Sequence, residues 1–478
     1  MTRKLLLLAV AALACGVCLQ AKVTLPSFIS DNMVLQQKTD AAIWGTAAPG
    51  KKVTLKASWS KKAVTATADA QTGKWLVRIP TPAAGGPYEI TVSDGEQVTL
   101  RNVLVGEVWF CTGQSNMGMP VRGFPASPVQ GSVDAILAAR PERQLRTCRI
   151  EPAWALTPTD KSTGSWQTDN PDAVAIISAA SYFFADVLQK ALDIPVGIIV
   201  SSAGGSPIEA WLPADYLEKN FPEVDLGTVK GEHPMVCEYI DASLLYNAML
   251  NPMFPYSVGG FIWYQGEGNR DNPDAYVVKQ TEYARMLREK FCSPQAPFYF
   301  VQIVPWTYGD PDGWCSGYFN EAQQKCLETI PHSRMAVTCD LADESNIHPS
   351  RKREVGQRLA MLALQHEYGF TAFNADAPVC KGVEYADGKA YVSFTVDELS
   401  LAPLGKAIEG FELAGEDKVF HASDARIDPD NFTRVIVECA DVPSPVAVRY
   451  AFRNLAKAGL FNNYGIPVAP FRTDDWKL

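Results

Sequence analysis

The feature that most constrains the fold is an alternation of short apolar runs with stretches of helical periodicity, from residue 103 to about residue 370. The apolar runs predict buried strands at 103–111, 196–200, 260–264, 298–304 and 335–339. The helical spacing predicts helices at 175–192, near 239–250, at 276–291, near 318–329 and at 351–368. This order favours an α/β fold with a parallel sheet covered on both faces. Ligands of such sheets bind beyond the carboxyl ends of the strands.

The flanking regions have a different pattern. Residues 23 to about 100, and those after about 375, contain short alternating runs divided by Gly- and Pro-rich turns, which predict β structure. A chain of 478 residues is too long for one ordinary domain. We expect a signal peptide at 1–21, an N-terminal β-sandwich domain at 22–100, a catalytic domain at 101–372 and a C-terminal β domain at 373–478.

The first residues have the pattern of an export signal. Arg3 and Lys4 precede an apolar core at 5–13 that is too short to span a bilayer, and cleavage is expected near Ala21. We therefore expect a periplasmic or secreted protein. Leu13-Ala14-Cys15 is only faintly similar to a lipoprotein processing site, so anchoring is the less favoured alternative. No later stretch predicts an integral membrane segment.

Charge and cysteine content exclude several classes of partner. The net charge of -10 argues against a nucleic-acid-binding surface, which needs a basic footprint. Of the 11 cysteines, those beyond the signal show no metal-ligand spacing, so we expect no metal and no cofactor. An oxidising compartment permits one or two disulfides, whose pairing the sequence does not define.

Polar clusters follow four of the predicted strands, at 112–116, 201–211, 265–269 and 340–349. The first presents Ser115 directly after a glycine turn, as hydrolytic α/β folds present a nucleophile. Of 5 histidines, only His348 follows a sheet strand. A serine hydroxyl needs a neighbouring base at neutral pH, so we predict Ser115 as nucleophile and His348 as general base.

The same loops contain suitable donors for an oxyanion. We expect the backbone N–H of Ser115, a backbone N–H of Gly204 or Gly205, and the side-chain amide of Gln265 to form the oxyanion hole, with Asn269 as second choice for the amide.

These segments resemble the sialate O-acetylesterases of the SGNH hydrolase superfamily. The similar motifs are Gly113–Met117, Gly204–Trp211, Trp263–Glu267 and Ile347–Pro349, together with Pro26–Gln36 and Leu245–Met249. The resemblance implies a flavodoxin-like SGNH hydrolase core flanked by an N-terminal β-sandwich and a C-terminal β domain. It further implies a metal-free serine esterase that acts on O-acetylated sugars, most of all on sialic acids.

One position departs from that pattern. Related enzymes place an aspartate three or two residues before the histidine, where this chain has Ser345 and Asn346. Asp343 is the acid we assign as partner of His348. The alternatives are Asp340, Glu344 or a backbone carbonyl, and the last would leave a Ser-His dyad.

Further polar residues of the loops are candidates for substrate binding, with packing or loop ordering as the alternative. They are Gln114, Asn116, Glu209, Trp211, Glu267 and Asn269. The basic run at 351–353 is expected to form the solvated first turn of the last helix, although it could also meet a sialate carboxylate.

The function expected from these observations is that of an exported serine esterase that deacetylates sugars, most of all sialic acids. A deacetylase for polysaccharides such as acetylated xylan is the alternative within the same class. A carbohydrate-binding protein that has kept the fold without turnover is the alternative from a different class.

Overall fold

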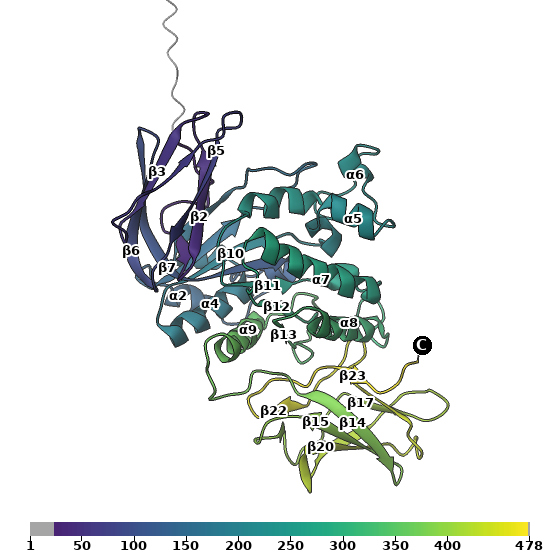
Figure 1. Ribbon diagram of the computed structural model, residues 1–478. Helices are drawn as coiled ribbons and strands as arrows, with labels where there is room; N and C mark the ends of the chain where they lie inside the picture. Colours follow the sequence, from purple (N-terminus) through teal and green to yellow (C-terminus); the bar gives the residue numbers. More distant parts are fainter. Residues whose placement is uncertain (1–22, 477–478) are drawn as a thin grey trace, which may run out of the picture.

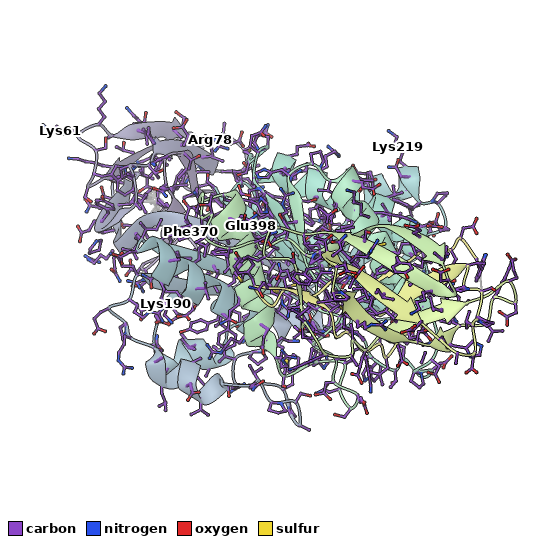
Figure 2. The ribbon with its side chains drawn as sticks, turned by 90° about the horizontal axis from the view of Figure 1, so that it is seen from below. Lys61, Arg78, Lys190, Lys219, Phe370 and Glu398 are labelled. Atoms are coloured by element: carbon purple, nitrogen blue, oxygen red, sulfur yellow. The ribbon has the colours of Figure 1, made fainter. Side chains whose placement is uncertain are left out.

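The computed structural model describes residues 23–476. Figure 1 shows an N-terminal group of strands, a central layer of sheet and helices, and a C-terminal group of strands, arranged along one long axis. The expected signal peptide lies outside the described residues. Within 23–476, no helix is long and apolar enough to cross a membrane. Figure 2 shows that Lys61 and Lys219 project outward from distant parts of this body.

The N-terminal strands form two sheets with a shared core. One sheet has the order β4-β3-β6-β7-β1 and the other pairs β2 with β5. The strands are β1 Val34–Gln36, β2 Asp40–Thr46, β3 Lys52–Ala57, β4 Val64–Thr67, β5 Lys74–Pro80, β6 Gly85–Ser93 and β7 Gln97–Gly113. Trp75, Val77 and Ile79 of β5 alternate with exposed residues, as expected for a strand with one buried face.

Strand β7 belongs to both the N-terminal and the central layers. Its first half pairs antiparallel with β6, and its second half pairs parallel with β10 and β11. The expected division between residues 100 and 101 therefore falls inside one continuous strand. The partner strands change later in β7, since β6 pairs with it as far as Val105 and β10 begins to pair with it at Glu107.

The central sheet has the order β13-β12-β11-β7-β10-β8-β9. Its other strands are β8 Leu145–Ile150, β9 Gly164–Thr168, β10 Val196–Ser202, β11 Gly260–Tyr264, β12 Phe298–Val301 and β13 Ser333–Ala336. The pairs are parallel except for β9, which lies antiparallel to β8 at the edge. The α/β class with a parallel sheet is confirmed.

Helices cover both faces of this sheet (Figure 1). α4 Ala179–Leu192 and α9 Lys352–His366 pack on one face, and α7 Pro273–Lys290 and α8 Cys315–Thr329 on the other. Alternate residues of β7 serve the two faces: Trp109 packs on Phe184 of α4, and Phe110 on Phe291 after α7. The shorter helices are α1 Ser115–Gly118, α2 Ser132–Ala138, α3 Pro171–Ile176, α5 Ala214–Asn220 and α6 Gly227–Lys230.

Several expected elements differ in extent. The helix expected near 239–250 is wrong in type, since a π-helical turn at Tyr246–Leu250 leads into a 3-10 turn at Asn251–Met253. Pro252 cannot continue the hydrogen-bond ladder there. The helix expected at 175–192 is divided, because Ser178 caps α4 by accepting a hydrogen bond from the N–H of Ser181.

The C-terminal strands are antiparallel and lie next to α8 (Figure 1). One sheet has the order β14-β15-β20-β19 and another β18-β17-β21-β23, and β16 pairs with β22. The strands are β14 Val379–Ala386, β15 Lys389–Thr395, β16 Leu401–Ala402, β17 Phe411–Ala414, β18 His421–Ala422, β19 Asp424–Asp428, β20 Asn431–Glu438, β21 Ala447–Tyr450, β22 Phe461–Asn462 and β23 Phe471–Arg472. Arg472 forms an ion pair with Glu321 of α8, and Gln324 donates to the carbonyl oxygen of Pro470, which fixes this layer to the core.

Candidate active site

The turn from β7 into α1 presents Ser115 at the carboxyl edge of the sheet. Gly113 has a φ of 144°, and a Cβ at this position would lie 2.1 Å from the carbonyl oxygen of Tyr264. Only glycine fits this approach between neighbouring strands. The N–H of Gln114 donates to the same carbonyl oxygen. Ser115 thus becomes the first residue of α1, where its backbone N–H has no partner within the helix.

His348 lies within hydrogen-bond distance of this serine. Its Nε2 is 2.8 Å from the Oγ of Ser115. The histidine comes from the loop between β13 and α9, which ends at the same edge of the sheet as β7. Two residues 233 positions apart in the sequence are therefore in hydrogen-bond contact, which is the arrangement that a serine nucleophile and its base require.

The backbone and ring of His348 are held by its neighbours. The side-chain oxygen of Asn346 accepts the N–H of His348 at 2.9 Å, and the amide nitrogen of Asn346 donates to the Oγ of Ser127 at 2.7 Å. The ring of Phe124 meets the imidazole edge-on, with 5.3 Å between centroids. These contacts orient the imidazole without a carboxylate.

A buried polar network lies beneath the pair. The amide nitrogen of Asn116 donates to Glu267 at 2.5 Å and to the carbonyl oxygen of Ile347 at 3.1 Å. Its side-chain oxygen accepts from the Nζ of Lys352 at 2.6 Å. Asn116 therefore ties the serine helix α1 to the histidine loop and to the start of α9. Asn116 and Glu267, expected to touch substrate, are both buried and bonded to each other.

Burial alters the protonation of this network. Burial raises the pKa of Glu267 above its ordinary value. It lowers the pKa of Lys352 to about 7, against the opposing attraction of Glu267. The pKa of His348 is also lowered, first by burial and then by the charge of Lys352. A lowered pKa keeps the imidazole neutral, and hence able to accept a proton, at mildly acidic pH.

Gly204 supplies a second backbone N–H beside the serine. A Cβ at Gly204 would lie 3.8 Å from the Cβ of Ser115, so the two backbones are close. Its N–H has no hydrogen-bond partner among residues 23–476. Gly205 has a φ of 73° and lies in open space. The N–H groups of Ser115 and Gly204 therefore have the free hydrogen-bonding capacity that an oxyanion hole needs.

Gln265 has a different role from the expected one. Its amide nitrogen donates to the carbonyl oxygen of Ser206 at 3.1 Å and to the side chain of Asn269 at 2.8 Å, which uses both of its N–H bonds. Asn269 accepts the N–H of Ile208 and donates to Glu209. Both amides thus hold the loop that contains Gly204, and neither directs a free donor toward Ser115.

The remaining expected substrate contacts also support this loop. Glu209 accepts from Lys279 at 2.6 Å, and the Nε1 of Trp211 donates to Ser206 at 2.9 Å. Gln114 is buried, and its side-chain oxygen accepts from the N–H groups of Gly266 and Gly268 at 3.4 Å each. These side chains position the loops around Ser115.

The acids near the histidine have other partners. Asp343 accepts hydrogen bonds from the N–H and the Oγ of Ser345. Asp340 forms an ion pair with Arg358. Within the described chain, neither carboxylate bonds to His348. The geometry brings Ser115 and His348 together and leaves Asp343 outside the pair.

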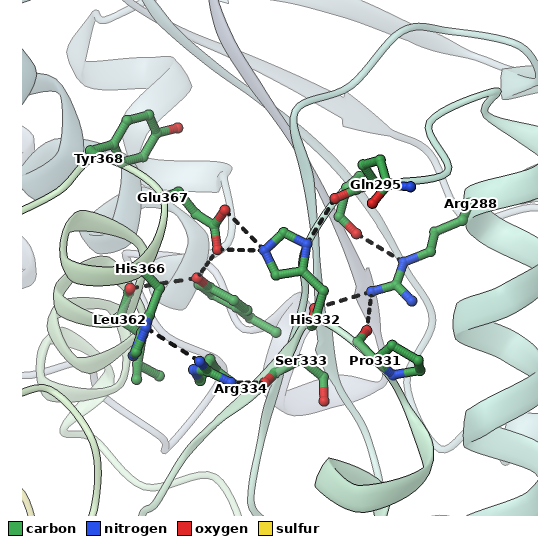
Figure 3. A network of polar contacts seen from close by, with 12 residues as sticks. Arg288, Gln295, Pro331, His332, Ser333, Arg334, Leu362, His366, Glu367 and Tyr368 are labelled. Atoms are coloured by element: carbon green, nitrogen blue, oxygen red, sulfur yellow. Dashed lines mark hydrogen bonds and ion pairs between the residues drawn. The ribbon is translucent and has the colours of Figure 1, made fainter.

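Two other histidines have structural partners (Figure 3). His332 lies between the carbonyl oxygen of Gln295 and the carboxylate of Glu367. The Nε2 of His366 lies 3.0 Å from Asp376. His332 comes just before β13 and Glu367 just after α9, so this network braces the amino end of the sheet, away from Ser115.

The expectation for Lys352 was wrong, since this residue is buried and not solvated. A sequence signal existed: a lysine in the first turn of a helix opposes the helix dipole and needs a compensating partner. Here the Nζ of Lys352 donates to Asn116, and the compensating negative charge is that of Glu267. Arg351, its neighbour, is partly exposed as expected.

The described part of the chain contains neither a metal-binding cluster nor a disulfide. Residues 23–476 hold no group of three or more His, Cys, Asp or Glu side chains that could bind a metal ion. The nine cysteines between Cys111 and Cys439 are free thiols.

Comparison with known proteins defines the family. The model of the family described as carbohydrate esterase, sialic acid-specific acetylesterase matches residues 105–365, which include both Ser115 and His348. The chain belongs to this family. It is accordingly a carboxylic ester hydrolase, and acetylated sugars are its class of substrate.

Individual relatives agree with this assignment. The chain is 29% identical to human sialate O-acetylesterase over 411 residues, covering 77% of this chain and 76% of that protein. It is 28% identical to the Pongo abelii sialate O-acetylesterase over 472 residues, covering 89% and 87%. A crystal structure of a carbohydrate acetylesterase from Xanthomonas citri is similar with a TM-score of 0.83 and 35% identity, covering 95% of this chain and 100% of that one.

Proposed function

We propose that this ester hydrolase removes O-acetyl groups from sugars, foremost sialic acids, through an acetyl-enzyme intermediate on Ser115. The observation that carries the proposal is the 2.8 Å hydrogen bond between the Oγ of Ser115 and the Nε2 of His348. Family membership and the names of the curated relatives support the choice of substrate.

Acylation begins when the Nε2 of His348 takes the hydroxyl proton of Ser115. The Oγ attacks the acetyl carbonyl carbon, and the carbonyl oxygen becomes an oxyanion that accepts hydrogen bonds from the N–H groups of Ser115 and Gly204. Hydrogen bonds from such fixed donors become stronger as negative charge develops on the carbonyl oxygen. The carbon–oxygen bond to the sugar then breaks, and the imidazolium returns its proton to the departing sugar hydroxyl.

Deacylation repeats these steps with water. His348 takes a proton from a water molecule, whose oxygen attacks the acetyl carbon, and the same N–H groups stabilise the second oxyanion. The bond to the Oγ of Ser115 breaks, and the serine recovers its proton from the imidazolium. The products are acetate and the deacetylated sugar.

The pair acts as a dyad in this proposal. Asn346 and Phe124 orient His348, and the lowered pKa of the imidazole keeps it neutral before reaction. Asp343 is kept out because Ser345 occupies its carboxylate.

The finer assignments of fold and location extend the same proposal. The central layer is a flavodoxin-like SGNH hydrolase core, and residues 22–100, 101–372 and 373–478 are the three parts of the mature protein. Residues 1–21 direct export to the periplasm or beyond. The apolar run near the N-terminus supports this location.

Product analysis tests the proposal directly. The protein is incubated side by side with O-acetylated sialic acids and with acetylated xylan, and acetate and deacetylated sugars are quantified. We expect acetate from the sialic acids at the higher kcat/KM. Faster release from xylan would replace the substrate assignment, and release from neither would refute the proposal.

A further inference from the structure

A cavity of about 420 Å³ is lined by residues that follow Ser115 in the chain, from Gly118 to Pro125, together with Arg149 and Ile176. Its lining includes Gly118, Pro120, Arg122, Phe124, Arg149 and Ile176. We call it the arginine cavity. Its volume falls within the range of roughly 300–1,000 Å³ that is typical of small-molecule sites.

The arginine cavity adjoins the reacting groups on two sides. Gly118 lies three residues after Ser115 in α1, which places it one helical turn away on the same face. Phe124 lines the cavity and also contacts the imidazole of His348. A ligand in the cavity is therefore close to the serine hydroxyl.

Arg122 brings an uncompensated positive charge to this cavity. Its backbone N–H donates to the carbonyl oxygen of Ala175 at 3.0 Å, which fixes the main chain at this position. Its guanidinium forms no ion pair or hydrogen bond within residues 23–476, and the side chain is exposed. The five N–H donors of an arginine suit a carboxylate in a two-point contact.

Arg149 provides the second guanidinium. It lies near the carboxyl end of β8, in register with Val200 of β10, and therefore at the same edge of the sheet as Ser115. Its ion pair with Glu151 spans 3.3 Å, with 40% and 50% of the two side chains exposed. A pair this exposed is weak and can be exchanged for a ligand carboxylate.

The charge of the arginine cavity contrasts with that of the whole chain. No carboxylate is among its described lining residues, whereas the protein carries a net charge of -10. An acidic protein that places two arginines beside its nucleophile favours an anionic ligand there.

A second cavity of about 480 Å³ adjoins the first, because Arg149 and Ile176 line both. Its lining contains two carboxylates, Glu151 and Asp172, so the anionic group of a ligand belongs in the first cavity and not in the second. The second cavity is otherwise rich in uncharged polar side chains, namely Thr147, Thr163, Ser165, Gln167 and Asn170. Hydroxyl and amide groups are suitable partners for the hydroxyls of a sugar.

We propose that Arg122 and Arg149 bind the carboxylate of an O-acetylated sugar acid and thereby select acidic over neutral acetylated sugars. The second, polar cavity then receives the remaining hydroxyls. This inference rests on the proposed deacetylase function, and it assigns the specificity of that site to two residues.

The test compares an acid with its neutral isostere. KM and kcat are measured for O-acetylated N-acetylneuraminic acid, for its carboxamide, for an O-acetylated galacturonic acid and for p-nitrophenyl acetate. The variants are Arg122→Gln, Arg149→Gln and Arg149→Lys. Arg101→Gln is the matched control, since it removes the same charge from a side chain that is 66% exposed at the far end of β7. Thermal unfolding checks that each variant is folded.

We expect Arg122→Gln to raise KM for the acetylated sialic acid by about 10- to 100-fold, since hydrogen bonds to charged groups are among the stronger ones. The carboxamide and p-nitrophenyl acetate should change by less than about threefold, and Arg101→Gln should match the wild type. Wild-type KM for the acid, but not for the carboxamide, should rise with ionic strength. The acid that shows the larger effect identifies the sugar.

Equal losses on the acid and on the carboxamide, or an unchanged KM for the acid in Arg122→Gln, would overturn the inference. A binding arm separates it from the function itself. Calorimetry with unacetylated N-acetylneuraminic acid should detect binding that Arg122→Gln weakens, whether or not the protein hydrolyses an ester. Hydrolysis of acetylated acids without such dependence on Arg122 would retain the function and reject the arginine cavity.

Discussion

The protonation of His348 sets the pH range in which Ser115 can react. The pKa of the imidazole lies below its ordinary value, first because of burial and second because of Lys352. His348 must be neutral to accept a proton, so activity falls as the pH drops through this pKa. We expect the acidic limb of the kcat/KM profile to lie below pH 6.5, the ordinary histidine value.

Replacing Lys352 by methionine tests the source of this shift. Without the positive charge the pKa of His348 rises, and the acidic limb moves to higher pH. We also expect kcat to fall about 10- to 100-fold, because Asn116 loses the partner that helps fix the serine helix. The control is Arg351→Met, one residue earlier and 41% exposed, which should move neither quantity. If the acidic limb of the kcat/KM profile does not move in Lys352→Met, the charge of Lys352 does not lower the pKa of His348.

The dyad predicts opposite results for two neighbouring residues. Asp343→Asn should change kcat/KM by less than about threefold, because the carboxylate of Asp343 bonds to Ser345 and not to His348. Asn346→Ala should lower kcat by about tenfold, because it removes the acceptor that holds the backbone N–H of His348. If Asp343→Asn instead lowers kcat/KM by several orders of magnitude, the mechanism is that of a Ser-His-Asp triad.

At the scale of single residues, the sequence predicted the positions of those residues that directly follow the ends of strands. Ser115, His348 and Gly204 were expected to lie close together because parallel strands bring their carboxyl ends to one edge, and the structure places them there. The partners of Gln265 and the burial of Lys352 were not predictable, because they depend on side-chain directions across loops that lie far apart in the sequence. A glutamine such as Gln265 is equally suited to an oxyanion hole, and a lysine such as Lys352 is equally suited to a solvated helix start. The residue type alone therefore did not decide between the two roles.

At the scale of elements, the turn between β7 and α1 determines where Ser115 lies. Gly113→Ala should cost about 1–3 kcal/mol from the backbone conformation alone, with a further cost from the contact at Tyr264, and should greatly reduce activity. The matched control is Gly50→Ala, which has a φ of 71° but nothing within 4 Å of the new Cβ. Gly50→Ala should lose only the stability that the unfavourable backbone conformation costs, and it should retain activity.

Chemical denaturation and kcat/KM measure the two effects. Equal destabilisation by both substitutions would show that the close approach to Tyr264 has no energetic consequence.

The order of elements around this turn could be predicted from the periodicity of the sequence. The π-helical turn at 246–250 could not, because its apolar spacing also fits an α-helix.

At the scale of the whole molecule, the C-terminal layer contains a buried ion pair that packs against the core through Trp314. Arg449 and Asp474 are 0% and 1% exposed, and the guanidinium is packed against Trp314 and Phe420. Arg449→Met leaves the carboxylate buried without its partner, which should cost about 3–5 kcal/mol of unfolding free energy. The sequence indicated β structure here, but not which side chains face α8.

A surface ion pair of the same layer is the control. Arg426 pairs with Glu438, and these side chains are 45% and 34% exposed, so Arg426→Met should cost less than about 1 kcal/mol. Urea denaturation compares the two variants. Similar small losses in both would mean that the C-terminal layer does not depend on its buried pair.

The central claim is that Ser115 is the nucleophile and His348 its base. The most direct measurement is the hydrolysis of an activated acetyl ester by the wild type, Ser115→Ala and His348→Ala at equal concentration, with folding verified by thermal unfolding. We predict that each substitution lowers kcat by at least about 10⁴-fold, because the two groups act as a unit. Hydrolysis by folded Ser115→Ala at a rate close to that of the wild type would contradict the account.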